Sequence, residues 1–308
     1  MKFSIYQDSR DGARKANQDR IGYCYSRDAL LMIVADGLGG HAHGELASQL
    51  VVQFLISSFQ REARPSLAEP DLFLARNINE AHLALIAYAA GRQFKDPPRT
   101  TCVACIVQNG VAYWAHVGDS RLYHLRDGTL LSRTRDHSRV QMLIDAGRLT
   151  ENGATRHPER NKIFNCIGSK AMPRVELSSS TPLKVGDTLL LCTDGVWGPW
   201  GDRELAAALG QDEIIRSVPA VMNEAEVRAG RYCDNLSVVA MTLGADDEPE
   251  EQPITERLST QAMALGAFST TTRGGKNPAG GEELTDEEID AAIAEIRRAF
   301  HHQQTDKR

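Results

Sequence analysis

The sequence predicts an α+β domain in which antiparallel sheets are covered by helices. Over residues 101–134, short apolar runs are separated by Asn-Gly and Asp-Gly pairs, the strongest short-range signal of β-hairpins. Two long segments, 45–60 and 72–90, follow one another and carry apolar residues at helical spacing. Strands in blocks and helices in pairs are typical of α+β architecture, whereas a parallel sheet would require alternating strands and helices.

The remaining elements follow from the same patterns in chain order. Strands are predicted by short apolar runs between turn residues over 3–7, 20–26, 30–34, 101–108, 111–117, 120–125, 129–134, 187–193 and 236–243. Helical spacing recurs near 138–146, over 202–209 with Asp202 as N-cap, and in a helix ending at 229 with Pro219 in its first turn. The polar, irregular stretch 148–162 resembles a flap in composition.

Composition places the chain among ordinary globular proteins. It has 308 residues, of which 42% are hydrophobic and 25% charged, with a net charge of −6. No apolar run approaches the roughly 18 residues of a membrane span, and the N-terminus lacks the apolar core of a signal peptide. We therefore expect a cytoplasmic monomer with neither a membrane nor a nucleic acid as partner. The six cysteines predict buried, reduced thiols, and Cys102 and Cys105 should point to opposite faces of one strand.

The composition changes at Gly244, so we expect residues 1–243 to form one domain. Residues 244–283 are first acidic and proline-bearing, then rich in threonine and glycine, and they predict a disordered linker. Residues 284–303 predict an amphipathic helix, because 285–288 form a capping box and an apolar stripe follows. This helix is either solvated and loosely packed or a tethered docking element.

Four aspartates occupy equivalent places at strand ends. Asp19 and Asp234 precede strands, whereas Asp36 and Asp194 follow strands and are each followed by glycine. Any one of them could be a simple turn residue. If they lie at one edge of packed sheets, four carboxylates cannot all remain ionised without cations between them. Oxygen ligands suit Mg²⁺ or Mn²⁺, and the lack of a matching histidine set argues against zinc.

Six ordered motifs carry a family resemblance. They lie at 14–19, 35–41, 117–121, 136–137, 192–197 and 234–235. In this order and spacing they resemble the bacterial protein phosphatase 2C family, which are metal-dependent serine/threonine phosphatases. The resemblance covers about residues 1–243. It implies a four-layer α-β-β-α sandwich, in which two antiparallel sheets pack face to face between helix pairs, with a small flap at about 138–165.

The resemblance also implies a binuclear Mg²⁺ or Mn²⁺ centre at one end of the sandwich. Asp36 would bridge the two ions and Gly37 would offer its carbonyl to one of them. The other ion would be held, directly or through water, by Asp19, Asp194 and Asp234.

Further positions correspond to family motifs outside this pair of ions. Asp119 would hold a third, looser ion together with Asp194, and Arg14 would bind the substrate phosphate. Animal members place a histidine, the proposed general acid, directly after Asp-Gly, where this chain has Leu38. His41 is either an acid or a helix cap, and His137 is either a structural partner or a ligand.

The implied activity is hydrolysis of phosphoserine and phosphothreonine on proteins by a metal-activated water, without a phosphoenzyme. The chain would then oppose a bacterial serine/threonine kinase, with phosphorylated proteins and that kinase as its partners. Two alternatives stay open. One is a hydrolase of small phosphoesters, which would share every ligand; the other is a signalling adaptor that acts through the C-terminal helix. The basic flap residues Arg148, Arg156, Arg160 and Lys162 either attract phosphorylated substrate or are simply solvated.

Overall fold

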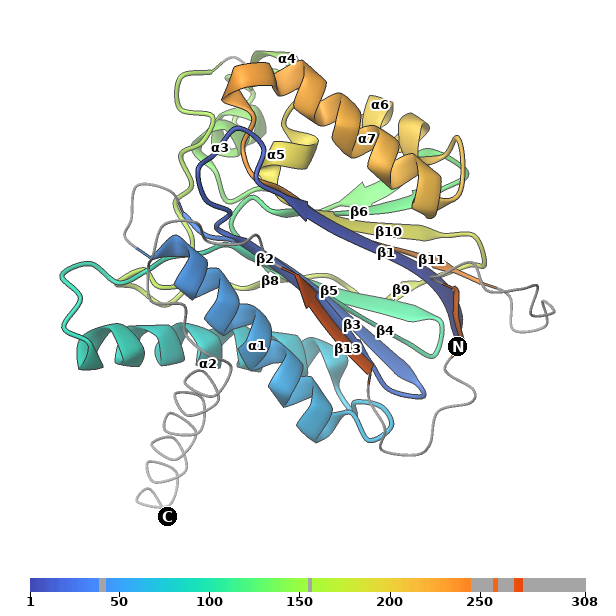
Figure 1. Cartoon of the computed structure of the whole chain (residues 1–308), viewed down its shortest axis with the longest axis horizontal. Helices are drawn as coiled ribbons and strands as arrows, with labels where there is room; N and C mark the ends of the chain where they lie inside the picture. The colour runs from blue at the N-terminus through green and yellow to red at the C-terminus, as the bar shows by residue number, and fades with distance from the viewer. Residues whose placement is uncertain (39–42, 155–156, 245–256, 260–268, 274–308) are drawn as a thin grey trace.

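The computed structural model describes residues 1–38, 43–154, 157–244, 257–259 and 269–273. It contains two antiparallel sheets stacked between helical layers, as Figure 1 shows. The predicted four-layer α-β-β-α sandwich is therefore confirmed. Within the described residues, no helix is long and apolar enough to cross a membrane.

The first sheet contains strands from both ends of the described chain. Its spatial order is β12 (Arg257–Ser259), β1 (Lys2–Arg10), β11 (Leu236–Leu243), β10 (Thr188–Cys192), β6 (Arg121–Arg126) and β7 (Thr129–Arg133). Three helices cover its outer face: α5 (Asp194–Trp197), α6 (Asp202–Leu209) and α7 (Ile214–Ala229), the last followed by the 3-10 turn η1 (Gly230–Tyr232).

The second sheet contains the predicted meander. Its order is β13 (Ser269–Arg273), β2 (Asp19–Tyr25), β3 (Ala29–Asp36), β4 (Cys102–Gln108), β5 (Val111–Val117) and β8 (Glu176–Leu177), while β9 (Thr181–Pro182) also pairs with β5. The long helices α1 (Gly44–Glu62) and α2 (Pro70–Gly91) cover its outer face. The short helices α3 (Arg139–Asp145) and α4 (Glu151–Ala154) belong to the predicted flap.

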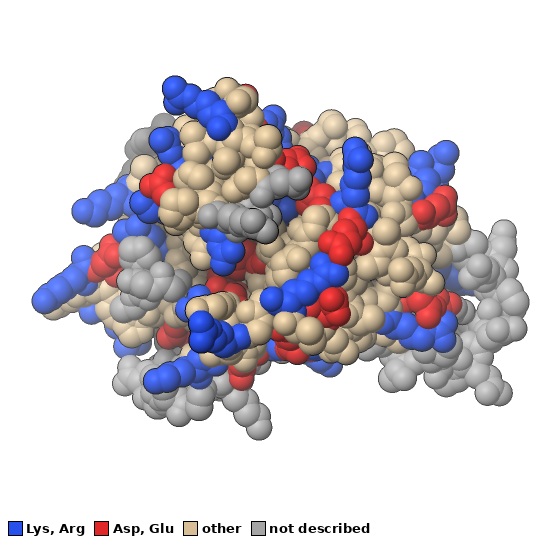
Figure 2. All heavy atoms as spheres, turned by 90° about the horizontal axis from the view of Figure 1, so that it is seen from above, with Lys and Arg blue, Asp and Glu red and all other residues tan. Residues whose placement is uncertain are grey.

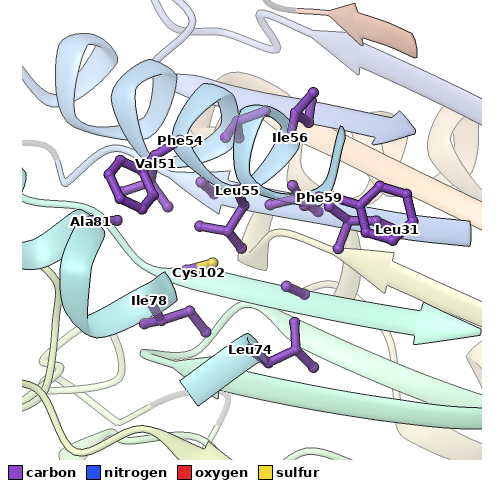
Figure 3. Packing of buried hydrophobic residues seen from close by; sticks show 14 of the residues in the cluster. Leu31, Val51, Phe54, Leu55, Ile56, Phe59, Leu74, Ile78, Ala81 and Cys102 are labelled. Atoms are coloured by element: carbon purple, nitrogen blue, oxygen red, sulfur yellow. The ribbon is translucent and has the colours of Figure 1, made fainter. Parts of the chain in front are cut away.

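Alternation along each central strand sends side chains to different cores. On β3, Leu31 and Ile33 pack toward α1 and α2, whereas Met32 and Val34 pack between the two sheets. Figure 3 shows Val51, Leu55 and Phe59 of α1 gathered with the strand residue Leu31 in the outer cluster. The strand register is thus fixed, because a shift by one residue would move buried side chains to the opposite face of the sheet.

The cysteine prediction is confirmed for the predicted strand pair. Cys102 belongs to the cluster beneath the helices and Cys105 to the cluster between the sheets. Both thiols are free and buried, and burial raises the pKa of Cys102 to about 12. These thiols therefore act as small apolar core groups.

Two helix starts differ from the prediction. The N-cap of α6 is Gly201, and Asp202 is the first helical residue. The Asp202 carboxylate accepts hydrogen bonds from Arg121, Arg133 and the Tyr123 hydroxyl. It therefore binds side chains of the first sheet rather than backbone N–H groups at the start of α6.

The second difference concerns α7, which begins at Ile214, so Pro219 lies in its second turn. The helix extends further toward its N-terminus because Ile214 and Val218 are buried against the first sheet. The apolar stripe therefore starts before the proline.

The prediction of a linker without regular structure is wrong for two short segments. β12 pairs with β1, and β13 pairs with β2 over five residue pairs. Edge strands offer unpaired backbone groups, so a polar segment can bind there without burying much apolar surface. The predicted helix at 284–303 and the remaining linker lie outside the described residues.

Candidate metal centre

The centre of the site is a pair of carboxylates on neighbouring strands. Asp19 opens β2 and Asp36 closes β3, and the two are directly opposite in the antiparallel register. Cross-strand partners on one face have Cβ atoms about 5 Å apart, so the register alone brings these two carboxylates together. Asp19 is buried, whereas Asp36 keeps part of its surface open to solvent.

The backbone of Asp36 is held by a threonine pair at the start of β4. Thr101 N–H and the Thr100 hydroxyl both donate to the Asp36 carbonyl, at 2.9 and 2.8 Å. The Asp36 N–H in turn donates to Thr101 Oγ1 at 3.0 Å. The backbone of Asp36 is therefore held at both its N–H and its carbonyl, which restricts the direction of its carboxylate.

The first sheet contributes the other two predicted aspartates. Asp194 is the first residue of α5, directly after β10, and Asp234 precedes β11. Thr193 joins the two sheets at this point, because its hydroxyl donates to Asp19 Oδ2 at 2.9 Å and accepts from Ser237 N–H at 3.1 Å. Sequence reasoning gave Thr193 no role, although it lies beside Asp194 in a quoted motif.

Charge repulsion shows that these aspartates lie within electrostatic reach of one another. Burial raises the pKa of Asp36 well above its ordinary value, and repulsion from Asp19 and Asp194 adds to it. Burial likewise raises the pKa of Asp19 to about 6, although hydrogen bonds from Ser237 and Thr193 oppose the change. The pKa of Asp194 is raised well above its ordinary value by burial, then by Asp119 and Asp234.

Asp119 joins this cluster from the turn between β5 and β6. It is buried, and burial followed by repulsion from Asp136 raises the pKa of its carboxyl to about 7. The structure thus brings together all five predicted aspartates. Two come from neighbouring strand ends of one sheet, one from the start of α5 and two from connections between elements.

Gly37 lies where the chain has no room for a side chain. A Cβ there would come within 2.3 Å of the Gly44 carbonyl oxygen and 2.7 Å of the Gln18 carbonyl oxygen. The Gly37 N–H donates to Gln18 O at 3.1 Å. Packing against the start of α1 therefore requires glycine here, and the role of its carbonyl as a ligand stays a prediction. His41 lies outside the described residues, so its predicted role is untested.

Arg14 lies on the β1–β2 loop, within electrostatic reach of three of the aspartates. Its side chain is 55% exposed and one guanidinium nitrogen donates to Asp234 Oδ2 at 2.7 Å. This hydrogen bond and the charge of Asp234 raise the pKa of Arg14. The loop itself is clamped by Asn235, whose Nδ2 donates to the carbonyls of Asp11 and Ala16. The role of Asn235 as an organiser of the loop was missed because it depends on a contact across the whole chain.

Two basic residues of the flap, Arg139 and Lys162, are paired with an acidic neighbour. Lys162 Nζ lies 2.8 Å from Glu159 Oε1, and Arg139 lies 3.8 Å from the same carboxylate. Arg156 lies outside the described residues. On the face drawn in Figure 2, Lys and Arg are interspersed with Asp and Glu, and the described part shows no continuous basic surface there.

Comparison with known proteins reveals relatives over most of the chain. The family profile for protein phosphatase 2C matches residues 7–227. The serine/threonine phosphatase stp of Listeria monocytogenes is 30% identical over 241 residues, which are 76% of this chain and 93% of the relative. PstP of Mycobacterium tuberculosis, a serine/threonine protein phosphatase, is 33% identical over 244 residues, 79% of this chain and 45% of the relative.

Solved structures agree with this assignment. Serine/threonine phosphatase Stp1 from Staphylococcus aureus superposes with a TM-score of 0.72 at 28% identity, covering 78% of this chain and 95% of that structure. The catalytic domain of PstP, solved in complex with two manganese ions, has a TM-score of 0.67 at 30% identity, covering 79% of this chain and 99% of that structure.

Proposed function

The chain belongs to the protein phosphatase 2C family and is a protein-serine/threonine phosphatase. From this premise we propose that four of its clustered aspartates form a binuclear Mn²⁺ or Mg²⁺ centre and that the fifth, Asp119, helps to hold a third ion. Metal dependence and phosphoprotein substrates follow from membership of the family. The number of ions, the residue that holds each one and the opposing kinase are the proposed part.

The donor set fits hard divalent cations. Every side-chain ligand in the cluster is a carboxylate, and Mn²⁺ and Mg²⁺ prefer oxygen donors with positions left for water. The observation that carries the proposal is the convergence of Asp19, Asp36, Asp119 and Asp194, whose pKa values are all raised, first by burial and further by neighbouring carboxylates. Cations between these groups would remove the repulsion and allow all of them to ionise at neutral pH.

The proposed assignment follows from position. Asp36 is repelled by each of the other four aspartates, so it would be the carboxylate shared by the pair of ions, with the Gly37 carbonyl as a further ligand. Asp19, Asp194 and Asp234 complete the pair of sites, and Asp119 with Asp194 holds a third ion. When bound, such ions activate a water for in-line attack on phosphorus and neutralise the developing charge. The two manganese ions in the PstP structure support the proposed pair of ions.

Arg14 is proposed to bind the phosphate of the substrate. Its side chain is more than half exposed and is anchored through one nitrogen, so the rest of its planar fork can face a phosphate. In the reaction, an oxygen–phosphorus bond forms from water while the bond to the seryl or threonyl oxygen breaks. No protein nucleophile is needed, so no phosphoenzyme should accumulate.

The decisive experiment is Asp36→Asn, assayed on a phosphothreonine peptide with Mn²⁺. We expect a loss of at least about 100-fold, because a bridging carboxylate is replaced by a neutral amide. Asp127→Asn is the matched control, since Asp127 also precedes a glycine but lies in the exposed β6–β7 turn. The wild-type enzyme with chelator should be inactive. Full activity of Asp36→Asn, or of the chelated enzyme, would contradict the proposal.

The substrate class needs a separate measurement. Phosphate release from phosphothreonine peptides and from small phosphometabolites should be compared with the same enzyme preparation. We expect the peptides to be turned over faster, as a phosphatase that opposes a serine/threonine kinase requires. Equal or greater turnover of small phosphoesters would instead favour the small-molecule hydrolase.

A further inference from the structure

We propose that His137 is a positioning residue for Asp119, because it holds both backbone polar groups of the preceding residue, Gly118. The inference rests on the proposed function, in which Asp119 contributes a ligand to the third ion. It concerns a histidine that the metal centre and the phosphate site do not use.

His137 binds Gly118 through two hydrogen bonds. The His137 N–H donates to the Gly118 carbonyl at 2.9 Å, and the Gly118 N–H donates to His137 Nδ1 at 3.2 Å. Gly118 has φ of +106°, and a Cβ there would lie 2.6 Å from Thr101 Cγ2. Glycine is therefore required in this turn, and its conformational freedom must be restrained by a partner.

The flap side of the site fixes the ring of His137. Asn165 Nδ2 lies 2.7 Å from His137 Nδ1, and the amide of Asn165 is oriented by two hydrogen bonds with the backbone of Arg174. Because Nδ1 accepts from two N–H donors, the ring proton is on Nε2, which lies 3.3 Å from Glu176 Oε2. The neighbouring donors thus keep Nδ1 of His137 unprotonated and available as a hydrogen-bond acceptor.

The same ring is unsuited to bind a metal. His116, His137 and Glu176 place one potential ligand atom each within 4.8 Å of one another. However, the two imidazole rings stack at 4.6 Å with an interplanar angle of 18°, so ring-plane lone pairs do not converge on one ion. The proton on Nε2 of His137 also occupies its remaining ligand position. We therefore assign this cluster a structural rather than a metal-binding role.

Neighbouring contacts connect the turn to the main centre. Trp197 Nε1 donates to the Asp119 carbonyl at 3.1 Å, and Ser120 Oγ lies 2.7 Å from Thr101 Oγ1. Thr101 Oγ1 also accepts the N–H of Asp36. Each residue of the turn is thus tied to a different element, and the Ser120 contact leads directly to the proposed bridging aspartate.

A clamp is needed here because the carboxylate is under repulsion. Asp119 is buried near Asp136 and Asp234, which disfavour its charged form. Without a bound cation, a flexible turn would relax so as to move this carboxylate away from its neighbours. Holding Gly118 therefore preorganises Asp119 before an ion arrives.

Two substitutions separate hydrogen bonding from packing. His137→Asn keeps an acceptor near the position of Nδ1 but removes the ring, whereas His137→Phe keeps the ring that stacks on His116 but removes the acceptor. The rate on a phosphothreonine peptide is measured as a function of Mn²⁺ concentration for both variants and for Asp119→Asn. His124→Phe is the control, because His124 is another buried histidine, which lies on β6 and is bonded to Asp187 just before β10.

We expect His137→Phe to raise the Mn²⁺ concentration for half-maximal rate by about 10-fold or more, the usual effect of removing a residue that orients a metal ligand. His137→Asn should stay within about three-fold of wild type on the same scale. Adding His137→Phe to Asp119→Asn should cause no further shift, since the two act through one carboxylate. His124→Phe should lower the unfolding temperature without changing the Mn²⁺ dependence.

Other outcomes overturn the inference in distinguishable ways. An unchanged Mn²⁺ dependence in His137→Phe, or full additivity with Asp119→Asn, would mean that His137 only packs. A defect in His137→Asn as large as that in His137→Phe would exclude the acceptor as the cause. If Asp119→Asn itself behaves as wild type, the proposed third site is wrong, and the premise fails before His137 is tested.

Discussion

The metal-free enzyme should lose stability as pH rises from about 4 to 7, and Mn²⁺ should reverse the loss. The reason is that Asp19 has a pKa of about 6 in the folded protein but an ordinary value of 3.8. Between these pH values the folded state binds more protons than the unfolded state, so the free energy of unfolding falls as pH rises. Asp36, Asp119 and Asp194 are shifted in the same direction.

The size of the effect follows from Asp19 alone. A shift of about two pKa units corresponds to about 3 kcal/mol, because each unit is about 1.4 kcal/mol. For a domain of this size, 1 kcal/mol changes the unfolding temperature by about 2–4 °C. The metal-free protein should thus melt about 6–12 °C lower at pH 8 than the carboxylate-protonated form would. The other aspartates repel Asp19 and one another, so their contributions do not simply add.

Buried histidines act in the opposite sense and must be separated. Burial lowers the pKa of His82, His116 and His137, so these residues favour the folded state as pH rises toward about 6.5. The informative quantity is therefore the difference between wild type and Asp19→Asn, measured at each pH. Both proteins share the histidines, and only wild type has the titrating Asp19 carboxyl.

The assay is thermal unfolding with chelator and with Mn²⁺ at pH 5, 6, 7 and 8. Without metal, Asp19→Asn should gain stability relative to wild type as pH rises through 6. With Mn²⁺ at about 100 times its dissociation constant, wild type should recover about 3 kcal/mol, and Asp19→Asn should recover less. A difference between the metal-free proteins that does not change with pH would refute the reasoning.

Four further predictions test other parts of the molecule. Arg14→Lys should lower kcat/KM on a phosphopeptide by about 10- to 100-fold with an unchanged unfolding temperature, since a point charge cannot copy the planar fork; unchanged kinetics would exclude the proposed phosphate contact. Asp187→Asn should cost about 2–4 kcal/mol in urea unfolding, because hydrogen bonds from Arg126, the backbone and a histidine outweigh burial and lower the pKa of Asp187 to about 2. Wild type should lose this stabilisation as pH falls from about 4 to 2, and the variant should not. Gly118→Ala should lower stability by about 2 kcal/mol or more, visible as a lower melting temperature in circular dichroism, because φ is positive and Thr101 occupies the space. Deleting residues 245–308 should leave peptide turnover within about two-fold but reduce stability by about 1–2 kcal/mol as β12 and β13 are lost; loss of most turnover would make the tail part of the enzyme.

Local patterns predicted most of the fold because they report burial over a few residues. The aliphatic run before Asp36 is buried on both faces, as a central strand must be, and its shortness, its aliphatic composition and the residues that bound it predicted the strand correctly. The same reasoning failed at Asp202, whose carboxylate binds Arg121 and Arg133 across the molecule rather than the start of α6. Residues favoured at helix caps are also good partners for arginine, and only the tertiary contacts separate the two uses.

Residues 269–273 show a second limit of prediction from local sequence patterns. The composition of 269–273 predicts a segment that does not order itself, because composition says nothing about a free sheet edge. β13 binds because β2 offers unpaired backbone groups, and Thr270 then accepts a hydrogen bond from Gln60 at 2.7 Å. Backbone pairing depends little on side-chain identity, so it leaves almost no trace in the sequence.

The sequence by itself predicted the α+β fold class, the order of the motifs and four aspartates at strand ends, because strand ends, glycine turns and hydrophobic periods are local properties. Only the tertiary structure decided that Asp19 opposes Asp36 in register, that Thr193 joins the two sheets, and that His137 accepts hydrogen bonds from two elements at once. These contacts join residues far apart in the chain, and their geometry arises only when the two sheets pack.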